Sequence, residues 1–220
     1  MIAVAPTPAE IAPAATVAPL VLAANATVAP TRTEPVIDAP ATTAFDALAS
    51  GMWTATADTL ANDGTDAVAA PWLALATAPS ATLVIEAEIR VTDLLDSVCD
   101  QSFGLTVGTR SPAQTIGGGL LFPCGGGPSR ARLTDVSVWE NGYNADPVLA
   151  EKAFEPGDDW RVYRFELDAG RLLLSVDGVE LLSIDSPAPI DPAVAESEAG
   201  IWTQGVGIQV RRLTVIPQAA

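Results

Sequence analysis

The pattern of apolar and polar residues from Trp160 to Ile184 is typical of three short β-strands joined by two tight turns. In the first segment Tyr163, Phe165 and Leu167 alternate with polar residues, which is the period of a β-strand with one buried face. Asp177-Gly178 separates the second segment from the third and is typical of a type I′ hairpin turn, which needs positive φ at both central positions. The pattern predicts a three-stranded antiparallel meander.

Similar segments recur from Phe45 onward. The longest covers 81–91 and places five apolar residues on one face: Leu83, Ile85, Ala87, Ile89 and Val91. Further strands are expected at 52–57, 72–73, 101–109, 119–122, 130–139, 199–203 and 206–216, with turns at 62–64 and at the glycine runs 117–119 and 125–128. No long stretch has a helical period. The chain is therefore predicted to be all-β, a two-sheet antiparallel sandwich over 45–217.

Residues 1–44 differ in composition, being rich in alanine, proline, threonine and valine with few charges. Proline disfavours helices and central strands, so this segment is predicted to be an extended Pro/Ala-rich arm. One hypothesis is a linker or stalk. The other is an assembly strand that adds to a sheet edge of its own domain or of a neighbouring subunit. The apolar residues that favour the second hypothesis are Val17, Leu20, Val21, Leu22 and Val28.

The net charge of -16 and the pI near 4.1 make nucleic acids and anionic membrane surfaces poor partners. Histidine is absent, which excludes Ser-His and Cys-His nucleophiles and histidine-ligated metals. No apolar run is long enough to span a bilayer. The start of the chain has no basic region and no uninterrupted apolar run, so a leader upstream, another export route or an internal location are the alternatives. We expect an extracellular or cell-surface protein.

The two cysteines, Cys99 and Cys124, do not form a Cys-x-x-Cys pair, so a zinc site is not expected. In an exported protein they would form a disulfide, whereas in a reducing compartment they would be two buried thiols. The disulfide is the favoured prediction.

Four stretches resemble the concanavalin A-like/laminin G-like jelly rolls: FDALASGMWTATADTLANDGT, TLVIEAEIRV, GDDWRVYRFELDAGRLLLSVDGVELLSI and AGIWTQGVGIQVRRLTVI. They look most like bacterial domains grouped with 3-keto-disaccharide hydrolases and family-16-type sandwiches. The residues at matching places are Trp160, Asp177, Gly178, Gly200, Gly207 and Leu213. The resemblance covers about 45–217 and implies the sandwich fold. Because these positions are structural, it implies no activity.

Glu86 and Glu88 are the main candidates for a catalytic carboxylate pair, because residues two apart on a strand share a face. Retaining glycosidases need two carboxyl groups about 5–5.5 Å apart. The E-x-D-x-x-E pattern of the laminarinase-type family is missing here, so a solvated outer face is the favoured interpretation and no enzyme is predicted.

A candidate ligand patch follows the strand expected at 130–139, where aromatic residues stand beside polar residues suited to sugars. Its members are Trp139, Glu140, Asn141, Tyr143 and Asn144. The alternative is a loop aromatic residue folded over the core. The other tryptophans, Trp53, Trp72, Trp160 and Trp202, are expected in the core.

No cofactor is predicted, although acidic residues at the strand ends leave a structural calcium site as an alternative to solvated turns. These residues are Asp63, Asp66, Asp93, Asp96, Asp158 and Asp159. The arginine pairs Arg130/Arg132 and Arg211/Arg212 are expected to form inter-strand charge pairs, or contacts to an acidic neighbour, rather than anion sites.

Three functions are compatible with these features. The first is a non-enzymatic extracellular structural subunit that self-assembles, as a filament or a surface layer, through its N-terminal arm. The second is a carbohydrate-binding module on a stalk, with glycans as partners. The third is a glycoside hydrolase-like enzyme, which depends on the family resemblance alone.

Overall fold

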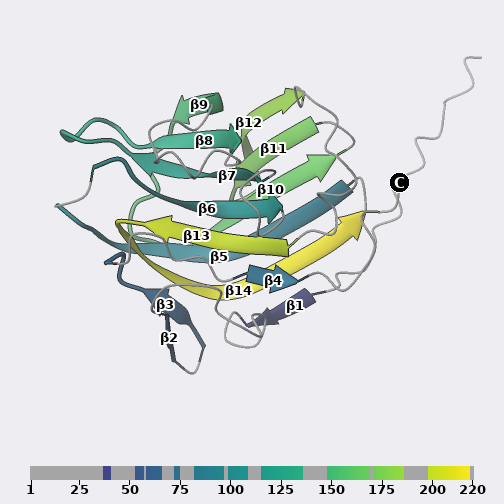
Figure 1. Ribbon diagram of the computed structural model, residues 1–220, viewed down its shortest axis with the longest axis horizontal. Helices are drawn as coiled ribbons and strands as arrows, with labels where there is room; N and C mark the ends of the chain where they lie inside the picture. The colour runs from purple at the N-terminus through teal and green to yellow at the C-terminus, as the bar shows by residue number, and fades with distance from the viewer. Residues whose placement is uncertain are drawn as a thin grey trace, which may run out of the picture. The chain divides into compact units, whose positions relative to one another are not determined.

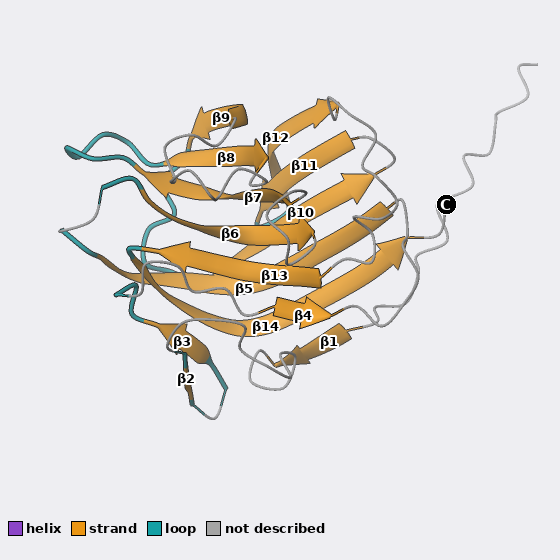
Figure 2. Cartoon of the chain, viewed as in Figure 1, coloured by secondary structure: helices purple, strands orange, loops and turns teal. Residues whose placement is uncertain are grey.

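The computed structural model describes residues 37–40, 53–56, 58–65, 72–74, 82–96, 99–108, 115–135, 148–168, 171–185 and 198–218. The chain divides into two units, Met1–Thr31 and Arg32–Ala220, and every described residue belongs to the second. The described residues form β-strands and no helix (Figure 2). The prediction of an all-β fold is confirmed. No helix in the described ranges is long and apolar enough to cross a membrane.

The strands form two antiparallel sheets. Sheet A contains, in spatial order, β12 (Val179–Asp185), β11 (Arg171–Val176), β10 (Arg161–Asp168), β5 (Thr82–Leu94), β14 (Val206–Gln218), β3 (Leu60–Asn62) and β2 (Thr54–Ala55), and β1 (Ile37–Pro40) also pairs with β14. Sheet B contains β4 (Trp72–Ala74), β13 (Glu198–Gln204), β6 (Gln101–Gly108), β7 (Thr115–Phe122), β8 (Arg130–Asp135) and β9 (Val148–Ala153). Figure 1 draws β6 and β13 of sheet B in front of β5 of sheet A.

One hydrophobic core lies between the sheets, and both contribute to it. Sheet A supplies Phe165 and Ile85, and sheet B supplies Phe103 and Leu105, all with 0% exposure. The Phe103 ring meets the Tyr163 ring edge-on at 5.2 Å between centroids. Burial raises the pKa of the Tyr163 hydroxyl. The alternation in the sequence therefore identified the buried face correctly.

The predicted meander is β10, β11 and β12, which pair in that order. Asp177 and Gly178 have φ of 51° and 76°, the positive values that a type I′ turn requires. Asp177 also accepts a hydrogen bond from the Val162 backbone N–H at 2.9 Å and pairs with Arg161 at 2.8 Å. The hairpin is thus stabilised by the side chain of its turn residue, Asp177, as well as by the backbone hydrogen bonds between its strands.

The glycine run 117–119 was wrongly predicted as a turn, because it lies in the middle of β7. Each of these glycines faces a close neighbour. A Cβ on Gly118 would lie 2.8 Å from Phe165 Cδ2 in the core, and one on Gly119 would lie 2.0 Å from the Phe103 carbonyl oxygen. Glycine is present here because other groups approach the backbone closely, not because the chain turns. The second run does form a turn, with Gly125 and Gly126 at positive φ.

Three other strands differ from the prediction. Within the segment 52–57, the described residues 53–56 contain only the two-residue β2, and Asn62, expected in a turn, ends β3. β9 was not predicted, because its sequence VLAEKA shows no clear alternation and most of its residues are exposed. β9 is an edge strand, where one face need not be apolar.

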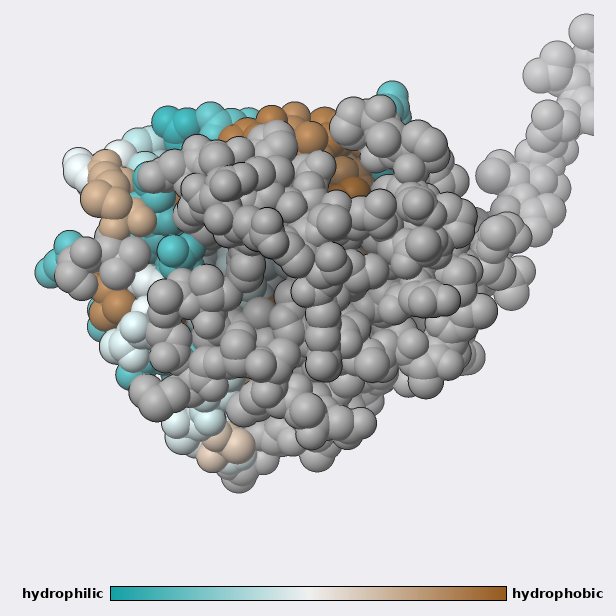
Figure 3. All heavy atoms as spheres, in the orientation of Figure 1, coloured by the Kyte–Doolittle hydropathy of each residue, from teal (hydrophilic) through white to brown (hydrophobic). Residues whose placement is uncertain are grey.

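β9 and β12 are the edge strands of the two sheets on one side of the sandwich. Val148 of β9 and Val179 of β12 are 42% and 62% exposed. Figure 3 shows apolar surface beside polar surface along the upper rim, where Figure 1 places these two strands. The apolar side chains at this rim mark the margin of the core.

β1 lies within the segment predicted to be an arm. Residues Ile37 to Pro40 pair with Val215 to Arg212 of β14 in the same chain. The other half of the same β14 edge pairs with β3. The end of the arm therefore adds a short strand to its own sheet, and the boundary at 44 remains a prediction.

Candidate functional site

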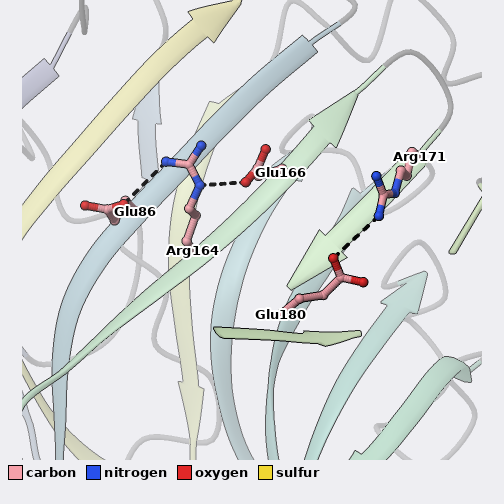
Figure 4. A network of polar contacts seen from close by, with 5 residues as sticks. All are labelled: Glu86, Arg164, Glu166, Arg171 and Glu180. Atoms are coloured by element: carbon pink, nitrogen blue, oxygen red, sulfur yellow. Dashed lines mark hydrogen bonds and ion pairs between the residues drawn. The ribbon is translucent and has the colours of Figure 1, made fainter. Parts of the chain in front are cut away.

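The two sheets have chemically different outer faces. On sheet A the charged side chains are paired with one another (Figure 4). Arg164 of β10 contacts Glu166 at 2.6 Å and Glu86 of β5 at 3.4 Å, and Arg171 of β11 contacts Glu180 of β12 at 3.5 Å. Partial burial opposes its charge, but the hydrogen bonds and charges of Glu166 and Glu86 raise the pKa of Arg164. The side chains drawn in Figure 4 are thus all engaged in ion pairs.

Trp160 belongs to the same outer face and not to the core, which corrects the sequence-based prediction. The guanidinium carbons of Arg90 and Arg211 lie 5.1 and 4.6 Å from its ring centroid. Arg90 donates to Gln209 at 2.6 Å, and Arg211 pairs with Glu88. The tryptophan is held by two cation–π contacts because the neighbouring strands present arginines rather than apolar side chains.

Glu86 and Glu88 share the outer face of sheet A, as their spacing predicted, and each is engaged by a different arginine. The hydrogen bond with Glu88 raises the pKa of Arg211, so this partner stays charged. Two carboxylates that each neutralise a separate arginine are suited to stabilising a sheet surface.

The outer face of sheet B is built from residues that alternate with core residues. Phe103 and Leu105 of β6 are buried between the sheets, so their neighbours along the strand point outward. The ladder register extends this face from β13 to β9. Its described members include Trp202 and Gln204 of β13, Ser102, Gly104 and Thr106 of β6, Gly117, Gly119 and Leu121 of β7, Arg130, Arg132 and Thr134 of β8, and Glu151 of β9.

Trp202 lies flat on this face, above glycines. A Cβ on Gly104 would lie 2.1 Å from Trp202 Cη2, and one on Gly117 would lie 3.0 Å from Cζ3. The indole Nε1 donates to Ser102 Oγ at 3.4 Å. Trp202 is buried, as predicted, but outside the core, because the glycines of two adjacent strands leave room for an indole on the outer side of the sheet.

Three polar atoms on this face are buried without a hydrogen-bond partner in the part of the chain that the structure describes. They are Thr106 Oγ1, Gln204 Oε1 and Arg132 Nε. A buried polar atom that lacks a partner costs about 1–3 kcal/mol, and native proteins tolerate few of them. Their presence on one face, beside a tryptophan, is the arrangement expected where hydroxyl or amide groups of a ligand complete the hydrogen bonds.

The central side chains of this face are buried: Thr106 and Ser102 are 2% exposed and Trp202 is 4% exposed.

Replacing Thr106 with valine is expected to leave the free energy of unfolding unchanged or to raise it by about 1 kcal/mol, because an unpartnered hydroxyl is removed at constant volume. The matched control is Thr203→Val. Thr203 is also fully buried, but its Oγ1 donates to the Val206 carbonyl oxygen at 2.5 Å, so this variant is expected to lose about 1–3 kcal/mol. Urea denaturation of both variants measures the difference. Equal losses would mean that the Thr106 hydroxyl has a partner in the folded protein.

Several predicted site residues lie outside the described residues, so their roles stay predictions. They are the ligand patch Trp139, Glu140, Asn141, Tyr143 and Asn144, and the arm residues Val17, Leu20, Val21, Leu22 and Val28. Trp72 lies in β4, and its side chain is not described either. Trp53 is half-buried and packs against the core.

Other predicted features are present. Cys99 and Cys124 form the disulfide. Arg130 and Arg132 pair with Glu151 on the adjacent strand, and Arg211 pairs with Glu88, as inter-strand charge pairs.

The described residues contain no cluster of three acidic side chains that could bind calcium. Asp66 lies outside the described residues. Asp63 instead accepts hydrogen bonds from the hydroxyl and the backbone N–H of Thr65, at 2.7 and 2.9 Å. These bonds lower the pKa of Asp63. The described acidic residues therefore do not fit a dedicated calcium site.

Sequence reasoning did not identify Thr106, Gln204 or Trp202 as functional candidates. Thr106 and Gln204 are ordinary strand residues, and Trp202 was assigned to the core. The available signal was the glycine run 117–119 together with Gly104, since glycines within strands mark places where another group approaches the backbone.

No known family model matches the chain, and no curated protein matches it. Solved structures do. The TM-score is 0.56 to the carbohydrate recognition domain of Emp47p, with 12% identity over 78% of this chain and 87% of that one. It is 0.55 to the carbohydrate-binding module CBM66 from Bacillus subtilis, with 12% identity over 77% and 94%. It is 0.53 to the CBM2 module of the Lactobacillus casei BL23 phage J-1 evolved Dit, with 8% identity over 78% and 81%. These similarities are in fold alone, and they confirm the predicted concanavalin A-like jelly-roll sandwich.

Proposed function

We propose that this chain is a non-enzymatic carbohydrate-binding domain of an exported protein, and that its ligand binds to the outer face of sheet B. The observation that carries the proposal is that Trp202 and three unpartnered polar atoms, on Thr106, Gln204 and Arg132, share this face. Glycan recognition needs both an apolar ring surface and fixed hydrogen-bonding groups, since sugars present C–H faces and hydroxyl groups together.

Two further observations support the proposal. The structures with a similar fold include a carbohydrate recognition domain and carbohydrate-binding modules. The Cys99–Cys124 disulfide is suited to an oxidising compartment, where secreted or lumenal glycan-binding domains function. The paired carboxylates of sheet A give no corresponding support to hydrolysis.

The predicted patch around Trp139 belongs to the same proposal. It follows β8 directly in the sequence, and Arg132 and Thr134 of β8 line the outer face of sheet B. We propose that Trp139 adds a second aromatic surface for a longer glycan.

The test is a glycan array with the full chain, followed by calorimetry with the glycans that bind. Thr106→Val is expected to weaken binding by about tenfold, since one hydrogen bond to the ligand is lost while the fold is retained. Trp139→Ala is also expected to weaken binding. Trp160→Ala is the matched control, because Trp160 lies on the outer face of sheet A, and its affinity should equal that of the wild type.

Each result of this experiment is informative. No bound glycan on a broad array would overturn the proposed function. Binding that is lost in Trp160→Ala but retained in Thr106→Val would move the site to sheet A. Turnover of a bound glycan that disappears in Glu86→Gln or Glu88→Gln would restore the hydrolase hypothesis.

Self-assembly through the arm gains no support from the described residues or from the similar structures. The only part of the arm that is described, β1, pairs with its own chain. Self-assembly remains a prediction for the residues before β1.

A further inference from the structure

Two arginines share one carboxylate on the outer face of sheet B. Arg130 Nη1 contacts Glu151 Oε1 at 2.5 Å, and Arg132 Nη2 contacts Glu151 Oε2 at 3.2 Å. Among the described residues, Glu151 is the only acidic side chain that pairs with either arginine. One carboxylate cannot neutralise two guanidinium groups, so these three side chains together keep one excess positive charge.

The excess is local and opposes the charge of the whole protein, which is -16. On sheet A, by contrast, Arg164 has two carboxylate partners, Glu166 and Glu86. Arg132 also keeps its buried Nε without a partner among the described residues. Arginine presents several N–H donors in a planar fork that matches a carboxylate or a sulfate, and Arg132 has not used all of its donors.

The excess charge lies in line with Trp202. The register places Trp202, Gly104, Gly119 and Arg132 side by side on four adjacent strands. With about 4.8 Å between strands, Trp202 and Arg132 are separated by roughly 14 Å at the backbone. Both residues between them are glycines, and the Trp202 ring lies over the first of these, Gly104. The row has the length of a short oligosaccharide.

We infer that the ligand is an anionic carbohydrate, and that its carboxylate or sulfate group is bound by Arg132 while another sugar unit lies against Trp202. This inference rests on the proposed function and adds the charge of the substrate. The ligand is therefore a negatively charged sugar, although the net charge of the whole protein repels polyanions.

The experiment measures calorimetric affinities of the full chain for oligogalacturonate, for its fully methyl-esterified form, for a chondroitin sulfate oligosaccharide and for a neutral galactan oligosaccharide. Oligogalacturonate or chondroitin sulfate is expected to bind at least tenfold more tightly than the neutral probes. The methyl ester isolates the carboxylate, since the sugar is otherwise the same. Preference between the two acidic probes identifies which anionic group is bound.

Two variants change the charge of the site in opposite directions. Arg132→Gln is expected to weaken binding of the acidic probe by about tenfold or more and to leave binding of the neutral probes unchanged. Glu151→Gln is expected to strengthen acidic binding several-fold, because both arginines lose their competing partner. The matched control is Arg171→Gln, which removes one charge from the exposed Arg171–Glu180 pair of sheet A and should change neither affinity. Melting curves verify that each variant is folded.

Glu151→Gln keeps the inference testable if Arg132→Gln fails to fold. Equal affinities for acidic and esterified probes, with no effect of Glu151→Gln, would overturn the anionic ligand but leave a neutral glycan site in place. If none of the four probes binds but the array yields a neutral glycan sensitive to Thr106→Val, only this inference fails. If neither the array nor the probes bind, the proposed function fails as well.

Discussion

Replacing Phe165 with alanine is expected to lower the free energy of unfolding by about 3–5 kcal/mol. Phe165 has 0% exposure and lies on the central strand β10, where it faces Ile85 of β5 and Leu174 of β11. It also touches the opposite sheet, since a Cβ on Gly118 would lie 2.8 Å from its ring. Alanine would leave a cavity that the paired strands on both sides prevent from closing.

The measurement is urea denaturation followed by tryptophan fluorescence. Val179→Ala is the control, because Val179 is 62% exposed at the end of β12 and should cost less than about 0.5 kcal/mol. A loss below about 1.5 kcal/mol in Phe165→Ala would mean that sheet B moves into the cavity. The two sheets would then be less firmly packed at Gly118 than the structure indicates.

Removing the disulfide is expected to cost about 3 kcal/mol. Cys99 and Cys124 are 25 residues apart in the sequence and join the connection between β5 and β6 to the turn between β7 and β8. Both side chains are exposed, so the double variant Cys99→Ser/Cys124→Ser changes little burial. Its cost should come mainly from the extra conformational freedom of the unfolded chain.

Denaturation of the double variant and of the reduced wild type should give matching midpoints, because both lack the same cross-link. A loss under about 1 kcal/mol would contradict this account and would indicate that the denatured chain is already compact around these two loops. Glycan affinity should change little, since the cysteines lie outside the outer face of sheet B as defined by its register.

The parts of the fold that the sequence predicted are those with a local cause. Asp177-Gly178 predicted its hairpin because turn geometry depends on two adjacent residues. The alternation in 81–91 predicted the buried face of β5 because neighbouring side chains must point in opposite directions. β9 was not predicted, because an edge strand whose residues are mostly exposed has no such alternation.

The tryptophans and glycines are the residues whose environments the local sequence pattern did not predict. Trp160 and Trp202 were both assigned to the core, yet one lies between two arginines and the other lies over glycines, each on an outer face. From the local sequence, a glycine run is predicted to form a turn, because the aromatic ring that packs against it is not apparent there. Those neighbours come from strands far away in the sequence.

By itself, the sequence determined the all-β class, the extended character of most strands and the residues that face the core, since periodicity and turn chemistry act over a few positions. Tertiary structure alone decided which outer face could serve as a binding site. Trp202 and Gly104 become neighbours only through the pairing of β13 with β6, and Arg132 joins their row only through β7 and β8. A shift of one residue in any of these ladders would turn the polar atoms to the other side of the sheet, so the candidate site is a property of the register.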